Sequence, residues 1–290
     1  METSELLKKV RKLEIKTKGL TKHIFSGEYH SAFKGRGMSF SEVRDYQYGD
    51  DVRNIDWNVT ARTGDPHIKI FEEERELTVM LLIDVSASSF FGTTSGFKSE
   101  MITELSAVLA FSATSNHDKV GAILFSDHIE KYLPPRKGKQ NILRIIRELI
   151  NLTPKQQGTN LSEALIYLNN IEKKRSITFV LSDFITDNYD QALTIAAKKH
   201  DIIGIRIWDE REQHLPDIGL VQVSDAETGA TKIVDTSDKG VRDRYTRAYE
   251  QRLDKFKTNF NFAKSDTISI HTNEDYIKVM HKFFKRRSKR

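Results

Sequence analysis

Residues 77–89, LTVMLLIDVSASS, decide the fold of this chain. The first part, residues 77–83, is almost continuously apolar, which is typical of a strand buried on both faces of a parallel sheet. Asp84, Ser86 and Ser88 follow directly at the carboxyl end of this strand. In an open parallel sheet, ligands bind in the crevice beyond the carboxyl ends of the strands. We therefore expect these three side chains to lie at a binding site.

The Asp-x-Ser-x-Ser loop has two interpretations. A carboxylate and two hydroxyls in one tight loop offer hard oxygen ligands, which suit a small divalent cation such as Mg²⁺. The same residues also fit a turn capped by Asp84, with a serine at the N-cap of the next helix. Both interpretations are open at this level.

Strand-like and helix-like segments alternate from residue 77 to about residue 207. Further strands are predicted at residues 119–125, 129–133, 176–181 and 201–208, and helices at residues 96–116, 139–152, from about 161, and 187–200. This alternation predicts an α/β fold with a doubly wound, mostly parallel sheet. Right-handed crossovers then place the carboxyl ends of the parallel strands on one edge of the sheet.

The sequence also predicts elements after residue 208 and a division of the chain into three parts. After residue 208, the patterns predict a hairpin (220–223 with 231–234), a charged helix (239–256), a last strand (268–270) and a terminal helix (275–284). We expect three parts: an N-terminal segment packed on the main domain, the main α/β domain, and a C-terminal helical extension with a basic tail. Their predicted bounds are residues 1–76, 77–235 and 236–290.

The N-terminal segment is unusual between residues 27 and 76, where charged, aromatic and glycine residues are dense and helical periodicity is weak. Residues 67–71 predict an edge strand, and residues 4–16 predict a short amphipathic helix. Trp57 is expected in the core.

A set of charged residues surrounds this tryptophan: Asp50, Asp51, Arg53, Asp56 and Arg62. On one interpretation they form a hydrogen-bonded network that holds an irregular region together. On the other, they form a docking surface for a partner.

Composition limits the possible chemistry. The formal net charge is +5 and cysteine is absent, which excludes disulfides, thiolate zinc sites and cysteine nucleophiles. No apolar run is long enough to cross a bilayer, and the charged amino-terminal residues lack the apolar core of a signal peptide. We therefore expect a cytoplasmic protein with no direct membrane insertion.

Basic residues cluster near residue 290: Lys282, Lys285, Arg286, Arg287, Lys289 and Arg290. A solvated, frayed tail is one interpretation. A patch for nucleic acid or an anionic membrane surface is the other.

Two further residues reach the same predicted edge as the Asp84 loop. Thr159 precedes a predicted helix, and Asp183 follows the strand predicted at residues 176–181. Together with Asp84, Ser86 and Ser88 they make a set of five oxygen donors. Mg²⁺ prefers octahedral oxygen coordination and keeps several waters, so a position remains for a carboxylate from outside.

These five residues resemble the metal-ion-dependent adhesion site (MIDAS) of von Willebrand factor A domains, in which an acidic residue of a protein ligand completes the shell of the metal. Upstream, the sequences YGDDVRNIDW (residues 48–57), TARTG (60–64) and FEEER (71–75) resemble bacterial domain-of-unknown-function family 58. That resemblance implies a von Willebrand A-like region and an association with MoxR-type AAA+ ATPases. Gln157 stands where a second glycine often precedes the threonine of the site.

The resemblance implies a non-enzymatic protein-interaction module with Mg²⁺ or Mn²⁺ at Asp84, Ser86, Ser88, Thr159 and Asp183, bound to an acidic residue of a MoxR-type ATPase. One alternative is a metal-dependent hydrolase or phosphotransferase. Against it, the loop lacks a second aspartate beside Asp84, and no Walker lysine or Gly-x-Ser-x-Gly motif is present. Binding of nucleic acid through the basic tail is the remaining alternative, and it predicts a steep dependence on salt.

Overall fold

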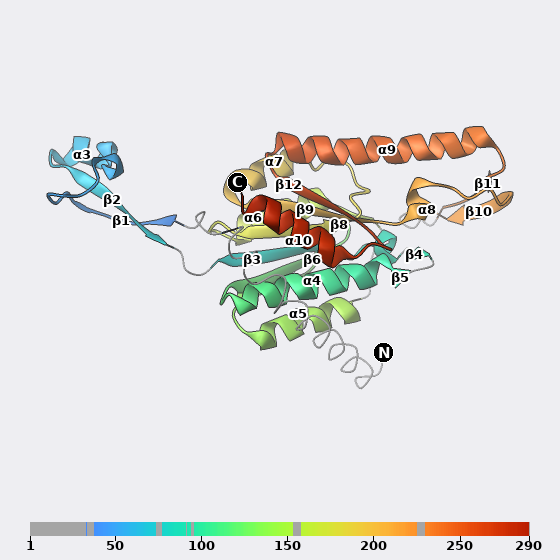
Figure 1. Ribbon diagram of the computed structural model, residues 1–290, viewed down its shortest axis with the longest axis horizontal. Helices are drawn as coiled ribbons and strands as arrows, with labels where there is room; N and C mark the ends of the chain where they lie inside the picture. Colours follow the sequence, from blue (N-terminus) through green and yellow to red (C-terminus); the bar gives the residue numbers. More distant parts are fainter. Residues whose placement is uncertain are drawn as a thin grey trace.

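The structure is a computed structural model, and it describes residues 33, 38–73, 77–90, 92–93, 96–152, 158–224 and 230–289. Its centre is a six-stranded sheet in the order β12-β9-β8-β3-β6-β7 (Figure 1). The strands are β3 (Thr78–Asp84), β6 (Lys119–Phe125), β7 (Ile129–Arg136), β8 (Ile177–Ser182), β9 (Asp201–Trp208) and β12 (Asp266–His271). All neighbours pair in parallel except β6 and β7. If these six strands are numbered 1 to 6 along the chain, their order in the sheet, read from β7 to β12, is 3-2-1-4-5-6. This is a doubly wound order, and it confirms the predicted fold class.

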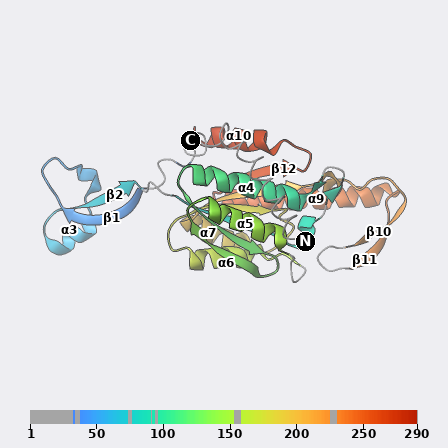
Figure 2. The same cartoon turned by 90° about the horizontal axis from the view of Figure 1, so that it is seen from below.

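Helices cover both faces of the sheet because successive residues of a buried strand point to opposite sides. Leu81 and Ile83 of β3 face one apolar cluster, which is completed by α4 (Lys98–Ser115), α5 (Lys139–Asn151) and α10 (Tyr276–Arg287). Met80 and Leu82 face the other cluster, which is completed by α6 (Leu161–Ile171), α7 (Asp190–Lys199) and α9 (Lys239–Phe262). Figure 1 shows α4 and α5 below the sheet and α7 and α9 above it, and Figure 2 looks from below onto α4 and α5.

Helix α9 approaches the sheet closely at Gly204 of β9. A Cβ atom at this position would lie 2.6 Å from the ring of Phe260 and 3.2 Å from the ring of Phe256. The glycine therefore gives the two rings of α9 the space to pack on the strand.

Most predicted elements are confirmed, with shifted ends. The strands predicted at residues 119–125 and 201–208 are β6 and β9. The strand predicted at residues 129–133 continues to Arg136, and its two prolines fit because β7 is an edge strand. The helix predicted from residue 96 begins at Lys98, after the short strands β4 (Gly92–Thr93) and β5 (Gly96–Phe97).

The segment after residue 235 does more than extend the domain with helices. The strands β10 (Leu220–Ser224) and β11 (Thr231–Asp235) form the predicted hairpin. Beyond it, β12 pairs in parallel with β9, so this segment supplies the edge strand of the main sheet. None of the described helices combines the length and the apolar composition that crossing a bilayer requires.

At least one of the basic residues near the end of the chain is buried in the folded protein, so they do not all form a frayed tail. Arg287 is the last residue of α10, and its side chain is only 3% exposed. It pairs with Asp201 and Asp266, and its guanidinium lies 4.7 Å from the ring centroid of Phe33. Lys282, Lys285, Arg286 and Lys289 are exposed, and Arg290 lies outside the described residues.

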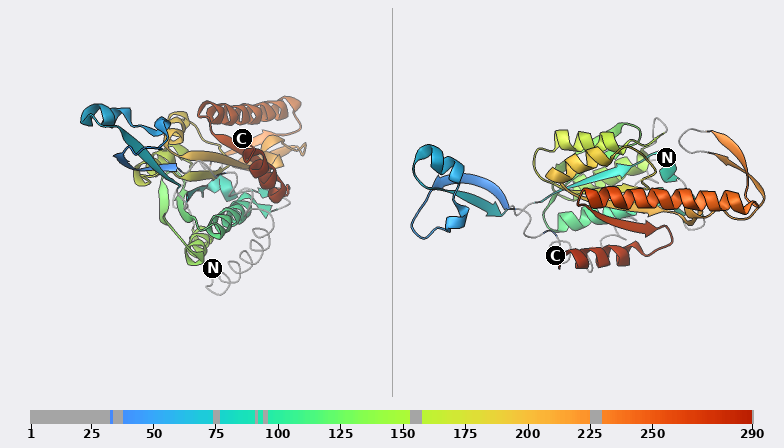
Figure 3. Two further views of the ribbon diagram at one scale, coloured as in Figure 1. Left: turned by 60° about the vertical axis from the view of Figure 1, so that its left-hand side comes forward. Right: turned by 90° about the horizontal axis from the view of Figure 1, so that it is seen from above.

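Residues 38–73 form a small lobe of their own, built from β1 (Met38–Asp45), η2 (Val52–Asn54), α3 (Trp57–Thr63) and β2 (His67–Glu73). The predicted edge strand is β2, and it pairs antiparallel with β1, which the sequence did not predict. The lobe extends from one end of the molecule, next to the start of β3 (Figures 1 and 3). The helix predicted at residues 4–16 lies outside the described residues.

The prediction that Trp57 belongs to the core is wrong, since it is 70% exposed and α3 buries none of its residues. The charged residues around it make local pairs rather than one network. Arg44 pairs with Asp50 at 2.8 Å, and Arg53 pairs with Asp51 at 2.8 Å. Asp56 caps α3 by accepting hydrogen bonds from the backbone N–H groups of Asn58 and Val59.

Candidate metal and interaction site at the sheet edge

Asp84 and Asp183 meet at the point where the sheet changes winding direction. Strand β3 ends at Asp84, and its neighbour β8 ends at Ser182, immediately before Asp183. From β3 the chain continues to β6 on one side, whereas β8 lies on the other side. Ligands of doubly wound proteins bind at this switch point, beyond the carboxyl ends of the strands.

The Asp84 loop is held by its own polar groups. The backbone N–H of Ser86 donates to Asp84 Oδ1 at 3.0 Å, and the hydroxyl oxygens of Ser86 and Ser88 lie 3.1 Å apart. Ser182 Oγ donates to Asp84 Oδ2 at 2.6 Å and thereby ties the ends of β3 and β8 together. Asp84 is 1% exposed. The turn capped by Asp84 is therefore present, and it holds the hydroxyls of Ser86 and Ser88 beside the Asp84 carboxylate.

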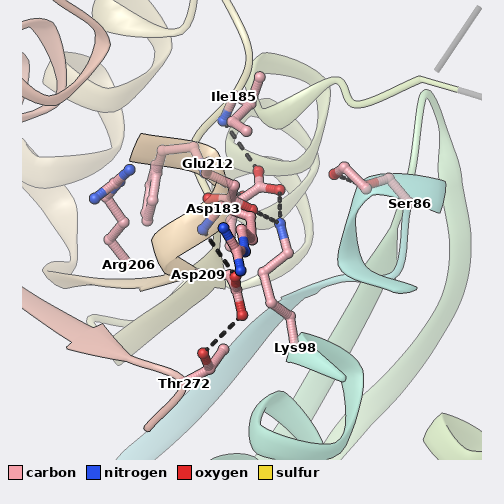
Figure 4. Close-up of polar contacts among 12 residues, drawn as sticks. Ser86, Lys98, Asp183, Ile185, Arg206, Asp209, Glu212 and Thr272 are labelled. Carbon is pink, nitrogen blue, oxygen red and sulfur yellow. Dashed lines mark hydrogen bonds and ion pairs between the residues drawn. The ribbon is translucent and has the colours of Figure 1, made fainter. Parts of the chain in front are cut away.

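Asp183 is bound on both carboxylate oxygens (Figure 4). The backbone N–H of Ile185 donates to Oδ1 at 3.0 Å, and Lys98 Nζ donates to Oδ2 at 2.7 Å. Lys98, at the start of α4, also donates to Glu212 Oε1 at 2.5 Å. Glu212 lies on the short helix α8 (Glu210–Gln213), which follows β9 at the same edge. Neither Lys98 nor Glu212 was predicted to belong to the site.

Burial and charge set the protonation of this cluster. Burial, reinforced by the negative charge of Asp183, raises the pKa of Asp84 to about 6. Burial also opposes ionisation of Asp183, but the Lys98 ammonium holds the pKa of that carboxyl below its usual value. The pKa of Glu212 is raised by burial. The pKa of Lys98 rises because its two carboxylate partners outweigh the effect of burial.

Thr159 lies at the same edge of the sheet, but its described contacts join it to neighbouring loops. Its carbonyl accepts a hydrogen bond from Thr186 Oγ1 at 2.8 Å, and the next residue, Asn160, donates its N–H to the carbonyl of Ser126 at 2.7 Å. Thr159 lines a cavity of about 760 Å³ together with Ile185 and Arg252. The structure therefore brings Asp84, Ser86, Ser88 and Asp183 together, whereas the described contacts of Thr159 are with the loop that follows Asp183.

The donor set suits a small divalent cation. Two carboxylates and two hydroxyls are hard oxygen ligands. In the part of the chain that the structure describes, Glu212 Oε2 is buried without a hydrogen-bond partner, so this cluster retains a buried acceptor. No group of three His, Cys, Asp or Glu side chains among the described residues is arranged to hold a metal. A metal site here would therefore draw on the hydroxyls of Ser86 and Ser88 as well as on the carboxylates.

Comparison with known proteins gives a family but no activity. The model of the family described as Protein of unknown function DUF58 matches residues 42–254. The uncharacterized protein Rv1480 of Mycobacterium tuberculosis is 29% identical over 280 residues, which cover 96% of this chain and 88% of that protein.

The chain is also similar to two solved structures at low sequence identity. The conserved hypothetical protein BatB from Bacteroides thetaiotaomicron has a TM-score of 0.46 and 14% identity, covering 74% of this chain and all of that one. The SpRpn10 VWA domain has a TM-score of 0.38 and 11% identity, covering 70% of this chain and 92% of that one.

Proposed function

This chain belongs to the protein family of unknown function DUF58, and we propose that it is a non-enzymatic interaction module that binds a protein partner through a metal site at the sheet edge. Its von Willebrand A-like fold suggests a module for protein interaction. The observation that carries the proposal is the meeting of two buried carboxylates, Asp84 and Asp183, at the switch point of the sheet.

Asp84, Ser86, Ser88, Thr159 and Asp183 are the proposed ligands, directly or through water. When bound, Mg²⁺ or Mn²⁺ would supply a positive charge and a coordination position open to a carboxylate. Asp84 can serve because a pKa of about 6 leaves it mostly ionised at pH 7. Ser182 Oγ and the Ser86 N–H fix its two oxygens in place.

The proposed partner is a MoxR-type AAA+ ATPase that offers an acidic residue. The choice of a MoxR-type ATPase rests on the sequence resemblance alone. The acidic chemistry has support from the surroundings of the site, because Arg252 lines both the large cavity beside Thr159 and the small cavity beside Asp183. A cationic side chain at this position favours an approaching acidic segment.

Titration calorimetry with Mg²⁺ and Mn²⁺ on the wild type and on Asp84→Ala tests the metal site. We expect saturable binding that is lost in the variant. Asp187→Ala is the matched control, because Asp187 lies at the same edge with its side chain 75% exposed. If Asp84→Ala binds the ions as the wild type does, the proposed ligand set is wrong.

The partner is tested separately with the purified full-length chain and a purified MoxR-type ATPase from the same organism. We expect binding in Mg²⁺ that is abolished by EDTA and by Asp84→Ala. Equal affinity with and without EDTA would contradict a metal-dependent contact.

A further inference from the structure

Lys98 is buried in a way that lysines rarely are. Its side chain is 1% exposed, and its ammonium contacts Asp183 Oδ2 at 2.7 Å and Glu212 Oε1 at 2.5 Å. A buried ammonium is tolerated only when it is paired and hydrogen-bonded. The two carboxylates meet this requirement, and they hold the charge directly at the proposed metal site.

Lys98 supplies positive charge to these carboxylates, as a bound metal ion would. Asp183 and Glu212 are buried carboxylates that share Lys98, and the buried carboxylate of Asp84 lies next to Asp183. Arg206 is also buried nearby, but its described hydrogen bond goes to the hydroxyl of Tyr249 at 3.1 Å. Lys98 is thus the cation in direct contact with Asp183, a proposed metal ligand.

Glu212 brings a buried carboxylate of the chain itself to the same edge of the sheet. Helix α8 is fixed at its start by Asp209, which accepts hydrogen bonds from the N–H of Arg211 and from Thr272 Oγ1 at 3.0 Å each. This anchoring directs Glu212 inward, where it is 8% exposed. The chain therefore carries its own acidic side chain at the edge where we propose that a partner's acidic residue binds.

We infer that Lys98 and Glu212 form an internal plug of the sheet-edge site. The ammonium takes the place of the metal and the Glu212 carboxylate takes the place of the partner's carboxylate, so both ligands bind tightly only when the pair separates. This inference rests on the proposed function and deepens it, because it makes the site self-inhibited in the isolated chain.

Mn²⁺ titration by calorimetry on the full chain tests the plug. Lys98→Met removes the competing charge and is expected to bind Mn²⁺ at least about tenfold more tightly than the wild type, since a unit charge a few ångströms from the site is removed. Because Lys98→Met leaves two carboxylates without their cation, the double variant Lys98→Met/Glu212→Gln is measured as well. Lys131→Met is the matched control, as it breaks a lysine–glutamate pair of 2.9 Å away from the site.

A second readout is the shift of the melting temperature on adding Mn²⁺, which is expected to be larger in the double variant than in the wild type. Tighter binding in the variants supports the plug, including the case in which the wild type shows no binding at all. Equal or weaker binding in both folded variants, with measurable binding in the wild type, overturns the plug and leaves the proposed metal site standing. Absence of binding in all variants overturns both.

Discussion

Lys98 Nζ lies 2.7 Å from Asp183 Oδ2, although the two residues are 85 positions apart in the sequence. The contact joins the start of α4 to the loop after β8, and both side chains are 1% exposed. A buried ion pair is weak support for stability, but loss of one partner is costly because the other charge stays buried. A change in the charge of either residue is therefore expected to change the stability of the chain.

Removal of Lys98 should destabilise the chain strongly. Lys98→Met is expected to lower the free energy of unfolding by about 3–5 kcal/mol at pH 7, because Asp183 and Glu212 lose their buried counter-ion. Glu212→Gln in the same background should restore part of the loss. Urea unfolding of the two single variants and the double variant gives the coupling energy, expected above about 1 kcal/mol. Additive effects would contradict direct coupling.

Asp84→Asn should stabilise the chain in the absence of metal. Folding raises the pKa of Asp84 from 3.8 to about 6, so the ionised group costs stability at neutral pH. The asparagine carries no charge, and we expect a gain of about 1–3 kcal/mol at pH 7, measured by urea unfolding in EDTA.

The gain in stability from Asp84→Asn should depend on pH. The folded state retains the Asp84 proton up to about pH 6, whereas the unfolded state releases it near pH 3.8, so the contribution of this residue to stability falls as the pH rises between these values. The gain from Asp84→Asn should therefore be small near pH 4 and complete above about pH 6. A variant that is less stable than the wild type at pH 7 would refute the account.

Arg287→Ala should be far more damaging than its position near the end of the chain suggests. The variant leaves Asp201 and Asp266 without their shared partner, and a loss of about 3–5 kcal/mol is expected. Arg286→Ala is the control, because Arg286 is exposed and its described partner is the ring of Phe283, 5.9 Å from its guanidinium. It should cost less than about 1 kcal/mol. Comparable losses in urea unfolding would contradict the assignment.

Trp57→Ala should leave stability almost unchanged. At 70% exposure the side chain buries little surface, so we expect a change within about 0.5 kcal/mol. Phe260→Ala provides the contrast, since this ring is fully buried against the sheet and its removal should cost about 3–5 kcal/mol. A large loss for Trp57→Ala would show that the tryptophan is packed after all.

Sequence patterns predicted elements well where burial imposes a period. The strands β6 and β9 match residues 119–125 and 201–208 because most residues of each strand are apolar and buried. Strand β1 escaped prediction because its sequence, MSFSEVRD, carries charged residues and its described side chains are exposed or half-buried. The prediction for Trp57 was wrong for a related reason. An aromatic side chain is buried only when its element packs against a hydrophobic core.

Local spacing alone places Asp84, Ser86 and Ser88 in one loop, and the shared edge of parallel strands brings Asp183 to them. The first feature is local in the sequence, and the second follows from the right-handed crossovers that put the carboxyl ends of parallel strands on one edge. The Lys98–Asp183–Glu212 contact depends on distant packing, since its members stand at a helix start, a strand end and a short helix, 85 and 114 positions apart from Lys98. A buried charge needs a counter-charge, but which one it finds depends on how helices α4 and α8 pack at the sheet edge, and no sequence period records that choice.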